Sequence, residues 1–335
     1  MKKKAQIQLQ FNWIFIGVVG AVVLIIFLSI ISGIRKTSEK SLASDALTYY
    51  DEIFTSMQSF ENTENSPDLL GFELDIDSEE DFCYYYTITG SDLGGRSIEY
   101  LPVFSPDNIR TKALSYSLGW DMPFRINYFL YLTSPDIAYV SVGNNEIEES
   151  LPNHLTLEKV DDAGDYENQN YYKIRFFSFD NDPSSYNLHR SVRNLDDNQV
   201  SAVYFKDNTI KFYEKDNDEF VLAGETYYID DSTILAGIYS ENLGSYECNL
   251  EKAITRINKV SKVLMARLDL IKKSSLLNSC SDSLYSQGEN MLFELIKETN
   301  KVEITKQSLS NMNTIRSSLQ NLNENLNENS CPTIY

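Results

Sequence analysis

The sequence has few residues of the kinds that catalytic and metal sites require. It contains only two histidines, His154 and His189, which lie far apart along the chain. Neither belongs to an H-x-x-x-H or H-E-x-x-H pattern, and no G-x-S-x-G, G-x-G-x-x-G or G-x-x-x-x-G-K-[ST] motif occurs. We therefore predict no catalytic residue, no metal ligand and no cofactor, and we expect that the protein is not an enzyme.

Positive charge is also scarce. The chain has 29 Lys and Arg against 49 Asp and Glu, which gives a formal net charge of −20. Such a negative field repels phosphate backbones, and we expect no stripe of Lys and Arg to offset it locally. The sequence therefore predicts no nucleic-acid partner.

Charged residues are absent from Ala5 to Ile34, and Trp13–Ile31 consists mostly of Val, Ile, Leu, Phe and Gly. A helix rises about 1.5 Å per residue, so roughly 20 apolar residues cross a bilayer core of about 30 Å. We predict an N-terminal tail and transmembrane helix over residues 1–34, with the lipid bilayer as partner. The apolar run exceeds the roughly 7–15 residues of a secretory signal core and lacks an A-x-A-like site, which favours a retained anchor.

The charges beside the span predict its orientation. Residues 2–4 are all Lys, whereas Arg35, Lys36 and Lys40 after the span are diluted by Glu39. The cysteines and the acidic excess of the remaining chain suit an extracytoplasmic body. We expect a single-pass protein of the cell membrane with a cytoplasmic N-terminus and an extracellular body.

Two regions follow the span. Residues 35–67 predict a juxtamembrane helix and linker, because apolar residues recur at helical spacing up to Met57. Residues 68–243 contain short alternating runs separated by turn signals, such as Asp207–Asn208, and predict an α+β domain with a mixed, largely antiparallel sheet. Within this region we predict a helix at Ile109–Leu118 and a strand at Thr233–Tyr239. Tyrosine pairs such as Tyr227–Tyr228 suit protein-binding or glycan-binding surfaces where they are exposed.

Residues 244–335 predict a C-terminal helical region with three apolar stripes. The β-branched run at Val302–Thr305 separates the second stripe from the third. If it breaks the helix, the region is a three-helix unit; if it does not, the region is a long helical hairpin.

The four cysteines are the candidate site residues, as disulfide partners: Cys83, Cys248, Cys280 and Cys331. None lies in a C-x-x-C pair, so a zinc site is disfavoured. A three-helix unit brings Cys280 and Cys331 to one pole, which favours a bond between them and a second bond between Cys83 and Cys248. In the hairpin alternative, Cys331 returns toward Cys248.

The sequence resembles two groups of known proteins. The start of the chain, from Lys3 to Phe15, and its end, Ser330–Tyr335, resemble uncharacterised single-pass membrane proteins of small-genome archaea, as do Tyr246–Cys248 and the Trp120–Tyr131 region. This resemblance implies an archaeal cell-envelope location and no particular activity. The Lys4–Gln6 junction is similar to the processing site of archaeal type IV pilin-like proteins, although Gln10 stands where those helices usually carry Glu.

Together these features predict a membrane-anchored extracytoplasmic protein of the cell envelope with an interaction or structural role. A protein partner or self-association would then serve that role. Two alternatives remain open from the residues alone: a pilin-like filament subunit, which would be cut before Gln6, and a membrane-anchored hydrolase.

Overall fold

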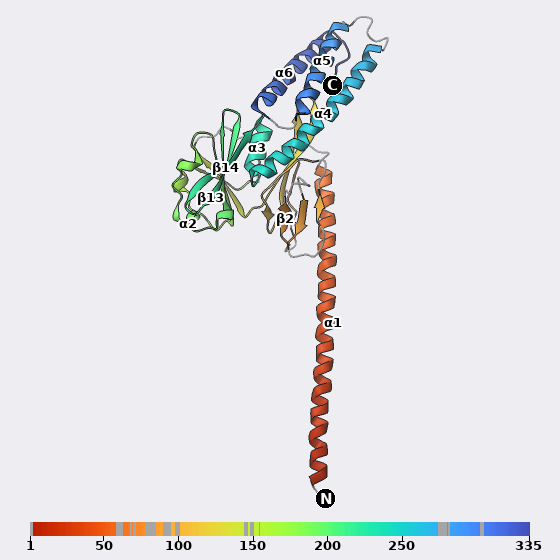
Figure 1. Ribbon diagram of the computed structural model, residues 1–335, viewed down its shortest axis with the longest axis vertical. Coiled ribbons are helices and arrows are strands. Elements are labelled where there is room, and N and C mark those ends of the chain that lie inside the picture. The colour runs from red at the N-terminus through yellow and green to blue at the C-terminus, as the bar shows by residue number, and fades with distance from the viewer. Residues whose placement is uncertain are drawn as a thin grey trace.

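The computed structural model describes residues 3–57, 63–67, 69, 72–77, 85–89, 95–97, 101–143, 147, 151–153, 155–273, 280, 282–301 and 305–335. The fold is α+β, as predicted. A long N-terminal helix enters a body built from three sheets, and a group of C-terminal helices covers the opposite end of that body (Figure 1). The helices are α1 (Lys3–Met57), α2 (Arg190–Arg193), α3 (Asp231–Tyr239), α4 (Leu243–Lys273), α5 (Asp282–Thr299) and α6 (Lys306–Glu328).

Helix α1 is continuous over 55 residues and has two halves with different surroundings. Its segment Ile16–Ile34 is long and apolar enough to cross a membrane, and none of it is buried in the body. Farther along, one face of α1 is buried at the spacing of an amphipathic helix: Ala43, Ala46, Leu47, Tyr50, Ile53, Phe54 and Met57. The predicted juxtamembrane helix is thus an unbroken extension of the predicted anchor.

The strands form three sheets, and most strand pairs are antiparallel. Their bounds are β1 (Thr63–Asn65), β2 (Leu74–Asp77), β3 (Tyr85–Ile88), β4 (Arg96–Ser97), β5 (Val103–Phe104), β6 (Asn108–Ile109), β7 (Leu114–Asp121), β8 (Arg125–Thr133), β9 (Ile137–Val142), β10 (Leu157–Val160), β11 (Lys173–Ser178), β12 (Val200–Lys206), β13 (Thr209–Asp216) and β14 (Glu219–Tyr227). Two sheets have four strands, in the orders β1-β7-β8-β5 and β4-β3-β2-β6. The third has six, in the order β10-β9-β11-β12-β13-β14.

The buried residues form three clusters that tie these layers together. The C-terminal half of α1 shares one core with both four-stranded sheets, including Leu74 of β2 and Leu130 of β8. The largest cluster joins the β7–β8 hairpin and one face of the six-stranded sheet to α3, α4, α5 and α6. The third lies on the other face of the six-stranded sheet, under α2 and its neighbouring loops.

The predicted turn at Asp207–Asn208 connects β12 to β13 as a hairpin. Both residues have positive φ angles, 52° and 64°, which the primed turns of two-residue hairpins require. The short polar side chains of Asp and Asn tolerate this conformation better than most residues do. This prediction is confirmed.

Two local predictions are wrong. The segment predicted as a strand at Thr233–Tyr239 is helix α3, and the helix predicted at Ile109–Leu118 lies across β6 and β7. Asp230 begins α3 through a capping box, because its Oδ1 accepts the Thr233 N–H at 3.1 Å and the Thr233 Oγ1 accepts the Asp230 N–H at 2.8 Å. Strand β7 instead pairs antiparallel with β8 along its length, so tertiary pairing prevails there over a short helix-like pattern.

The C-terminal region is a three-helix unit, which resolves the alternative left by the sequence. Thr305 caps α6 by accepting the Ser308 N–H at 3.1 Å, so a new helix begins directly after residues 302–304. Asn258 of α4 connects to the end of α5, since its amide donates to the Ile296 carbonyl at 3.0 Å. The unit lies at the end of the body opposite the apolar half of α1 (Figure 1).

Candidate functional site

The histidines take no part in a reactive cluster among the described residues. His189 caps the short helix α2, where its Nδ1 accepts the Ser191 N–H at 3.3 Å and lies 2.8 Å from the Ser191 hydroxyl. His154 lies outside the described residues. In the part of the chain that the structure describes, no three His, Cys, Asp or Glu side chains gather as metal ligands would.

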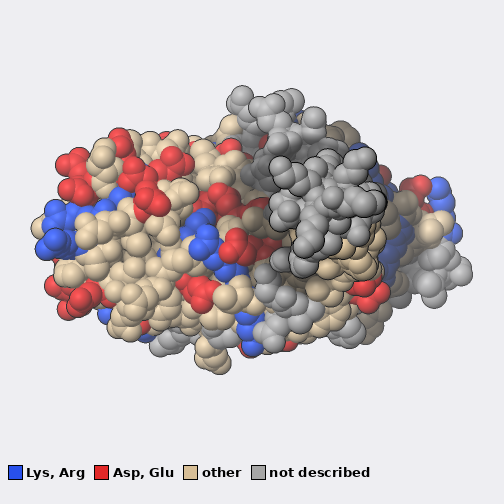
Figure 2. Space-filling model, turned by 90° about the horizontal axis from the view of Figure 1, so that it is seen from below, with Lys and Arg blue, Asp and Glu red and all other residues tan. Residues whose placement is uncertain are grey.

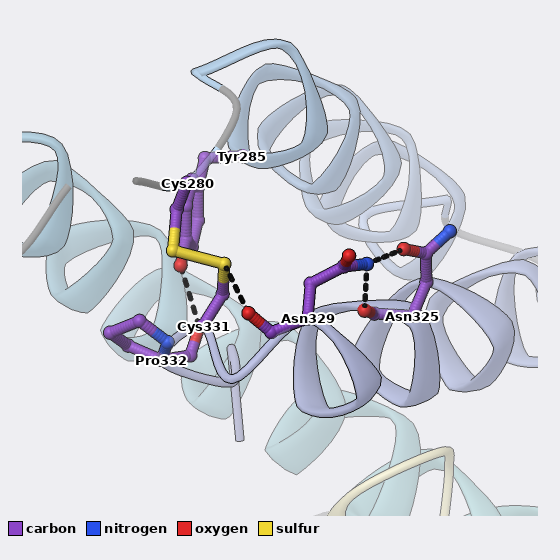
Figure 3. Close-up of a disulfide and its surroundings, with 6 residues drawn as sticks. All are labelled: Cys280, Tyr285, Asn325, Asn329, Cys331 and Pro332. Carbon is purple, nitrogen blue, oxygen red and sulfur yellow. Dashed lines mark hydrogen bonds between the residues drawn. A yellow bond between two sulfur atoms is a disulfide. The ribbon is translucent and has the colours of Figure 1, made fainter. Parts of the chain in front are cut away.

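Cys280 and Cys331 form a disulfide, with their Cα atoms 5.9 Å apart. The pairing predicted from a three-helix unit is therefore confirmed. Figure 3 shows Cys280 just before α5 and Cys331 just after α6, with the Tyr285 hydroxyl donating to the Pro332 carbonyl at 2.9 Å beside the bond. Cys248 is also disulfide-bonded. Its predicted partner, Cys83, lies outside the described residues, so that pairing stays a prediction.

The chain after the disulfide packs back onto the helices. The Asn323 side chain holds it at two points, by accepting the Ile334 N–H at 2.7 Å and donating to the Tyr335 carbonyl at 3.1 Å. Ile334 is fully buried against Gly288 of α5, where a Cβ would lie 2.5 Å from the Ile334 side chain. The disulfide pole is thus a structural clamp. A groove of about 370 Å³ lies beside the tail, lined by Pro123, Gln320, Asn323, Glu324, Asn327, Thr333 and Tyr335.

A polar cluster around Arg175 is buried where β11 meets the end of α3. The Arg175 guanidinium donates to the carbonyls of Gly237, Ser240 and Glu241 at 2.7–3.2 Å, and so satisfies the free carbonyls at the end of α3. Burial lowers the pKa of Arg175 to about 10. The space beside it is only about 10 Å³, enough for one water at most. This cluster is an internal junction rather than a ligand site.

A groove of about 440 Å³ lies between α6 and the hairpin turn of the six-stranded sheet. We call it the α6 groove. Its lining is polar and aromatic and contains no carboxylate: Asn208, Tyr227, Tyr228, Lys306, Leu309, Ser310, Asn313, Thr314 and Ser317.

The fold fixes both walls of the α6 groove. On the sheet side, the Tyr228 N–H donates to the Asn208 carbonyl at 3.1 Å, and the Tyr246 hydroxyl donates to the Tyr227 carbonyl at 3.0 Å. On the helix side, the buried Leu309 forms the apolar base beneath the polar residues of α6. Lys306 also lines the groove and makes no ion pair with any described residue.

The chemistry of the α6 groove suits binding. Amide and hydroxyl groups offer donors and acceptors together, and tyrosine rings offer flat apolar surface. Histidine, the commonest proton-transfer group, and carboxylates are both absent from the lining residues of this groove. Of the lining residues, the sequence drew attention only to Asn208 and to Tyr227–Tyr228.

Comparison with protein-family models, with curated proteins and with solved structures gives no match to this chain.

Proposed function

We propose that this protein is a single-pass membrane protein that displays its body on the outer face of the cell membrane. Its role there is interaction or envelope structure rather than catalysis. The observation that carries the proposal is the division of α1, whose segment Ile16–Ile34 is apolar and unburied while its Ala43–Met57 face is buried in the body. Water is a poor solvent for such a segment, and a bilayer core is a good one.

The geometry of α1 also suits display. The helix has no break between the apolar segment and the body, so the body does not hang from a flexible linker. From Ile34 to Met57 the helix extends by about 35 Å. On the body face turned toward the apolar half of α1, the visible acidic and basic side chains are interspersed (Figure 2). The described part of that face therefore shows no broad basic patch for lipid headgroups, and α1 is the proposed contact with the bilayer.

The disulfide supports the outward orientation. Disulfides persist in oxidising compartments and are rare in the cytosol, and the bond between Cys280 and Cys331 closes the helical unit of the body. The three Lys residues at positions 2–4 also favour a cytoplasmic N-terminus, because positive charges beside a span stay preferentially on the cytoplasmic side.

Charged substitutions in the span test the anchor. Leu24→Asp with Ile25→Asp places two charges at the centre of the segment, at a cost of about 3 kcal/mol each. We expect this variant to leave the membrane fraction on alkaline carbonate washing, whereas the unchanged chain stays. Leu42→Asp, at an exposed position beyond the span, is the matched control and should stay as well. Equal retention of the double variant and the unchanged chain would contradict the proposal.

A second candidate function is a pilin-like filament subunit. The specific observation in its favour is that one unbroken helix both projects from the body and packs into it. Processing before Gln6 would leave this helix intact and free to pack against copies of itself. The N-terminal peptide of the protein from native membranes decides the point: a start at Gln6 supports a filament subunit, and retention of residues 2–5 contradicts it.

A further inference from the structure

The outward side of α4 differs in charge from the rest of the molecule. This helix carries seven Lys and Arg against three Asp and Glu, in a chain with a net charge of −20. Five of its residues recur at intervals of three or four and so lie along one line of the helix: Arg256, Lys259, Val263, Arg267 and Leu270. We call them the α4 stripe, and it contains no acidic residue.

The α4 stripe is exposed to an unusual degree. Leu270 is 71% and Val263 67% exposed, more than any other large hydrophobic residue described, including Ile34 of the membrane segment at 65%. Soluble surfaces tolerate single exposed aliphatic side chains. Here two of them lie on the same side of α4, two turns apart, with Arg267 between them.

The cations of the α4 stripe are also unneutralised. Arg256, Lys259 and Arg267 make no ion pair with any described residue. Two other cations of the same helix behave differently, because Lys272 pairs with Glu289 at 2.8 Å and Lys273 with Asp269 at 2.9 Å. The positive charge of the stripe is therefore available to a partner.

The position of the stripe indicates the direction from which a partner comes. Helix α4 belongs to the helical unit at the end of the body opposite the apolar half of α1 (Figure 1). If α1 spans the membrane as proposed, the body lies between α4 and the headgroups of that membrane. A partner docked on α4 would then contact the end of the body that lies away from the protein's own bilayer.

We propose that the α4 stripe docks an acidic protein whose contact surface combines carboxylates with apolar side chains. Charge complementarity steers such a partner and fixes its orientation on the stripe. Burial of Val263 and Leu270 adds the apolar contact that interface centres need, with arginine among the residues enriched there. A nucleic acid would satisfy the cations but would have no use for this apolar pair. The protein's own bilayer is disfavoured by position, because α4 lies at the end of the body opposite the apolar half of α1.

A binding assay on the full chain tests this chemistry. The chain is placed in nanodiscs of zwitterionic lipid and titrated with a labelled amphipathic helical peptide that carries Glu and Leu on one face, with empty nanodiscs as background. Arg256→Glu with Arg267→Glu, and separately Val263→Ser with Leu270→Ser, should each weaken peptide binding by about tenfold or more. All four residues are exposed, so we expect both variants to unfold at the same temperature as the unchanged chain.

Matched controls lie elsewhere on the surface. Arg190→Glu with Lys206→Glu changes the same charge outside the stripe, and Val221→Ser with Leu222→Ser removes exposed aliphatic side chains from β14. Both controls should bind the peptide within about twofold of the unchanged chain. Equal binding by stripe and control variants would overturn the proposal. So would equally tight binding of a peptide with Ser in place of Leu, of anionic vesicles or of a single-stranded oligonucleotide, because charge alone would then account for it.

This inference rests on the proposed function for the direction of approach, but the assay does not depend on membrane orientation. If the chain binds the peptide but its body faces the cytosol, the docking proposal stands and the proposed display on the outer face is wrong. If the body faces outward but the chain does not bind the peptide, the proposed display stands and the docking proposal is wrong.

Discussion

Asp230 is the residue at which three parts of the body meet. Its Oδ2 accepts the Trp120 Nε1–H of β7 at 2.9 Å and lies 3.6 Å from the Arg316 guanidinium of α6, while its Oδ1 caps α3 through Thr233. Burial raises the pKa of Asp230 in spite of these donors and of the nearby Arg316. The carboxyl group therefore stabilises the junction through hydrogen bonds at the cost of being desolvated.

Removing the Asp230 carboxyl group should destabilise the body. Asp230→Ala leaves the Trp120 and Thr233 N–H groups without their acceptor, which costs about 3 kcal/mol. Asp230→Asn keeps one oxygen as an acceptor, so we expect a smaller loss. Urea unfolding followed by tryptophan fluorescence measures both, and equal free energies of unfolding for the two variants and the unchanged chain would contradict this role.

The raised pKa of Asp230 also predicts a pH dependence. A carboxyl group whose folded pKa exceeds its unfolded value contributes stability that is fully present below the unfolded pKa, about 4. That contribution is lost as pH rises through the folded pKa. The unchanged chain should therefore lose stability relative to Asp230→Asn as pH rises from about 4 toward neutral. A difference that stays constant, or that grows in the opposite direction, would refute the assignment.

Among the elements, α1 depends on the body over its last stretch, from Ala43 to Met57. Phe54 is buried between Tyr50, with ring centroids 6.5 Å apart, and Tyr86 of β3, at 5.6 Å and nearly perpendicular. The Ser117 hydroxyl of β7 donates to the Met57 carbonyl at 2.9 Å and so secures the end of the helix. The orientation of the projecting half follows from these contacts.

Truncating Phe54 tests that dependence. Phe54→Ala opens a cavity under α1 and should cost about 3–5 kcal/mol. Leu42→Ala, at a half-exposed position of the same helix, should change stability by less than about 0.5 kcal/mol. Thermal unfolding of the two variants in the same detergent compares them, and similar melting temperatures would show that α1 is not part of the core.

The Cys280–Cys331 bond should dominate the stability of the helical unit. It closes a loop of 51 residues, for which chain entropy gives about 4 kcal/mol. Cys280→Ser with Cys331→Ser should therefore speed amide hydrogen exchange in α5 and α6, while the six-stranded sheet keeps its protection. If exchange rises equally in both regions, the bond stabilises the whole body instead.

Elements with strong periodicity could be predicted from the sequence, and short ones could not. The apolar stripes of the C-terminal helices and the apolar run of α1 are longer than any strand. Their length therefore identifies these segments as helices. The segment at Thr233–Tyr239 is a short apolar run that suits either structure; the capping residue Asp230 was the signal that distinguished a helix.

The candidate sites could be predicted only in part. The walls of the α6 groove come from segments about a hundred positions apart, and no motif connects Tyr228 with Asn313. The expectation that no stripe of Lys and Arg offsets the negative charge is wrong for α4, where core residues such as Ile257 and Leu264 lie between the cations along the sequence. Helical geometry separates them, since residues three or four apart share a face and their immediate neighbours do not.

At the scale of the whole molecule, charge and hydropathy are divided along the long axis. The apolar segment of α1 lies at one end, the sheets occupy the middle, and the helical unit with its basic stripe lies at the other end (Figure 1). A protein that is anchored at one end and contacts partners at the other needs a stiff connection between them. The continuous α1 and the cores that join it to the sheets supply that connection.

The most direct test of this account is lysine labelling of the native chain in intact cells with a membrane-impermeant, amine-reactive reagent, followed by peptide mass analysis. If α1 spans the membrane with the body outside, Lys259 and Lys306 are labelled in intact cells, and residues 2–4 are labelled only after permeabilisation. Labelling of residues 2–4 in intact cells, with the lysines of the body protected, would reverse the orientation and contradict the proposed display of the body.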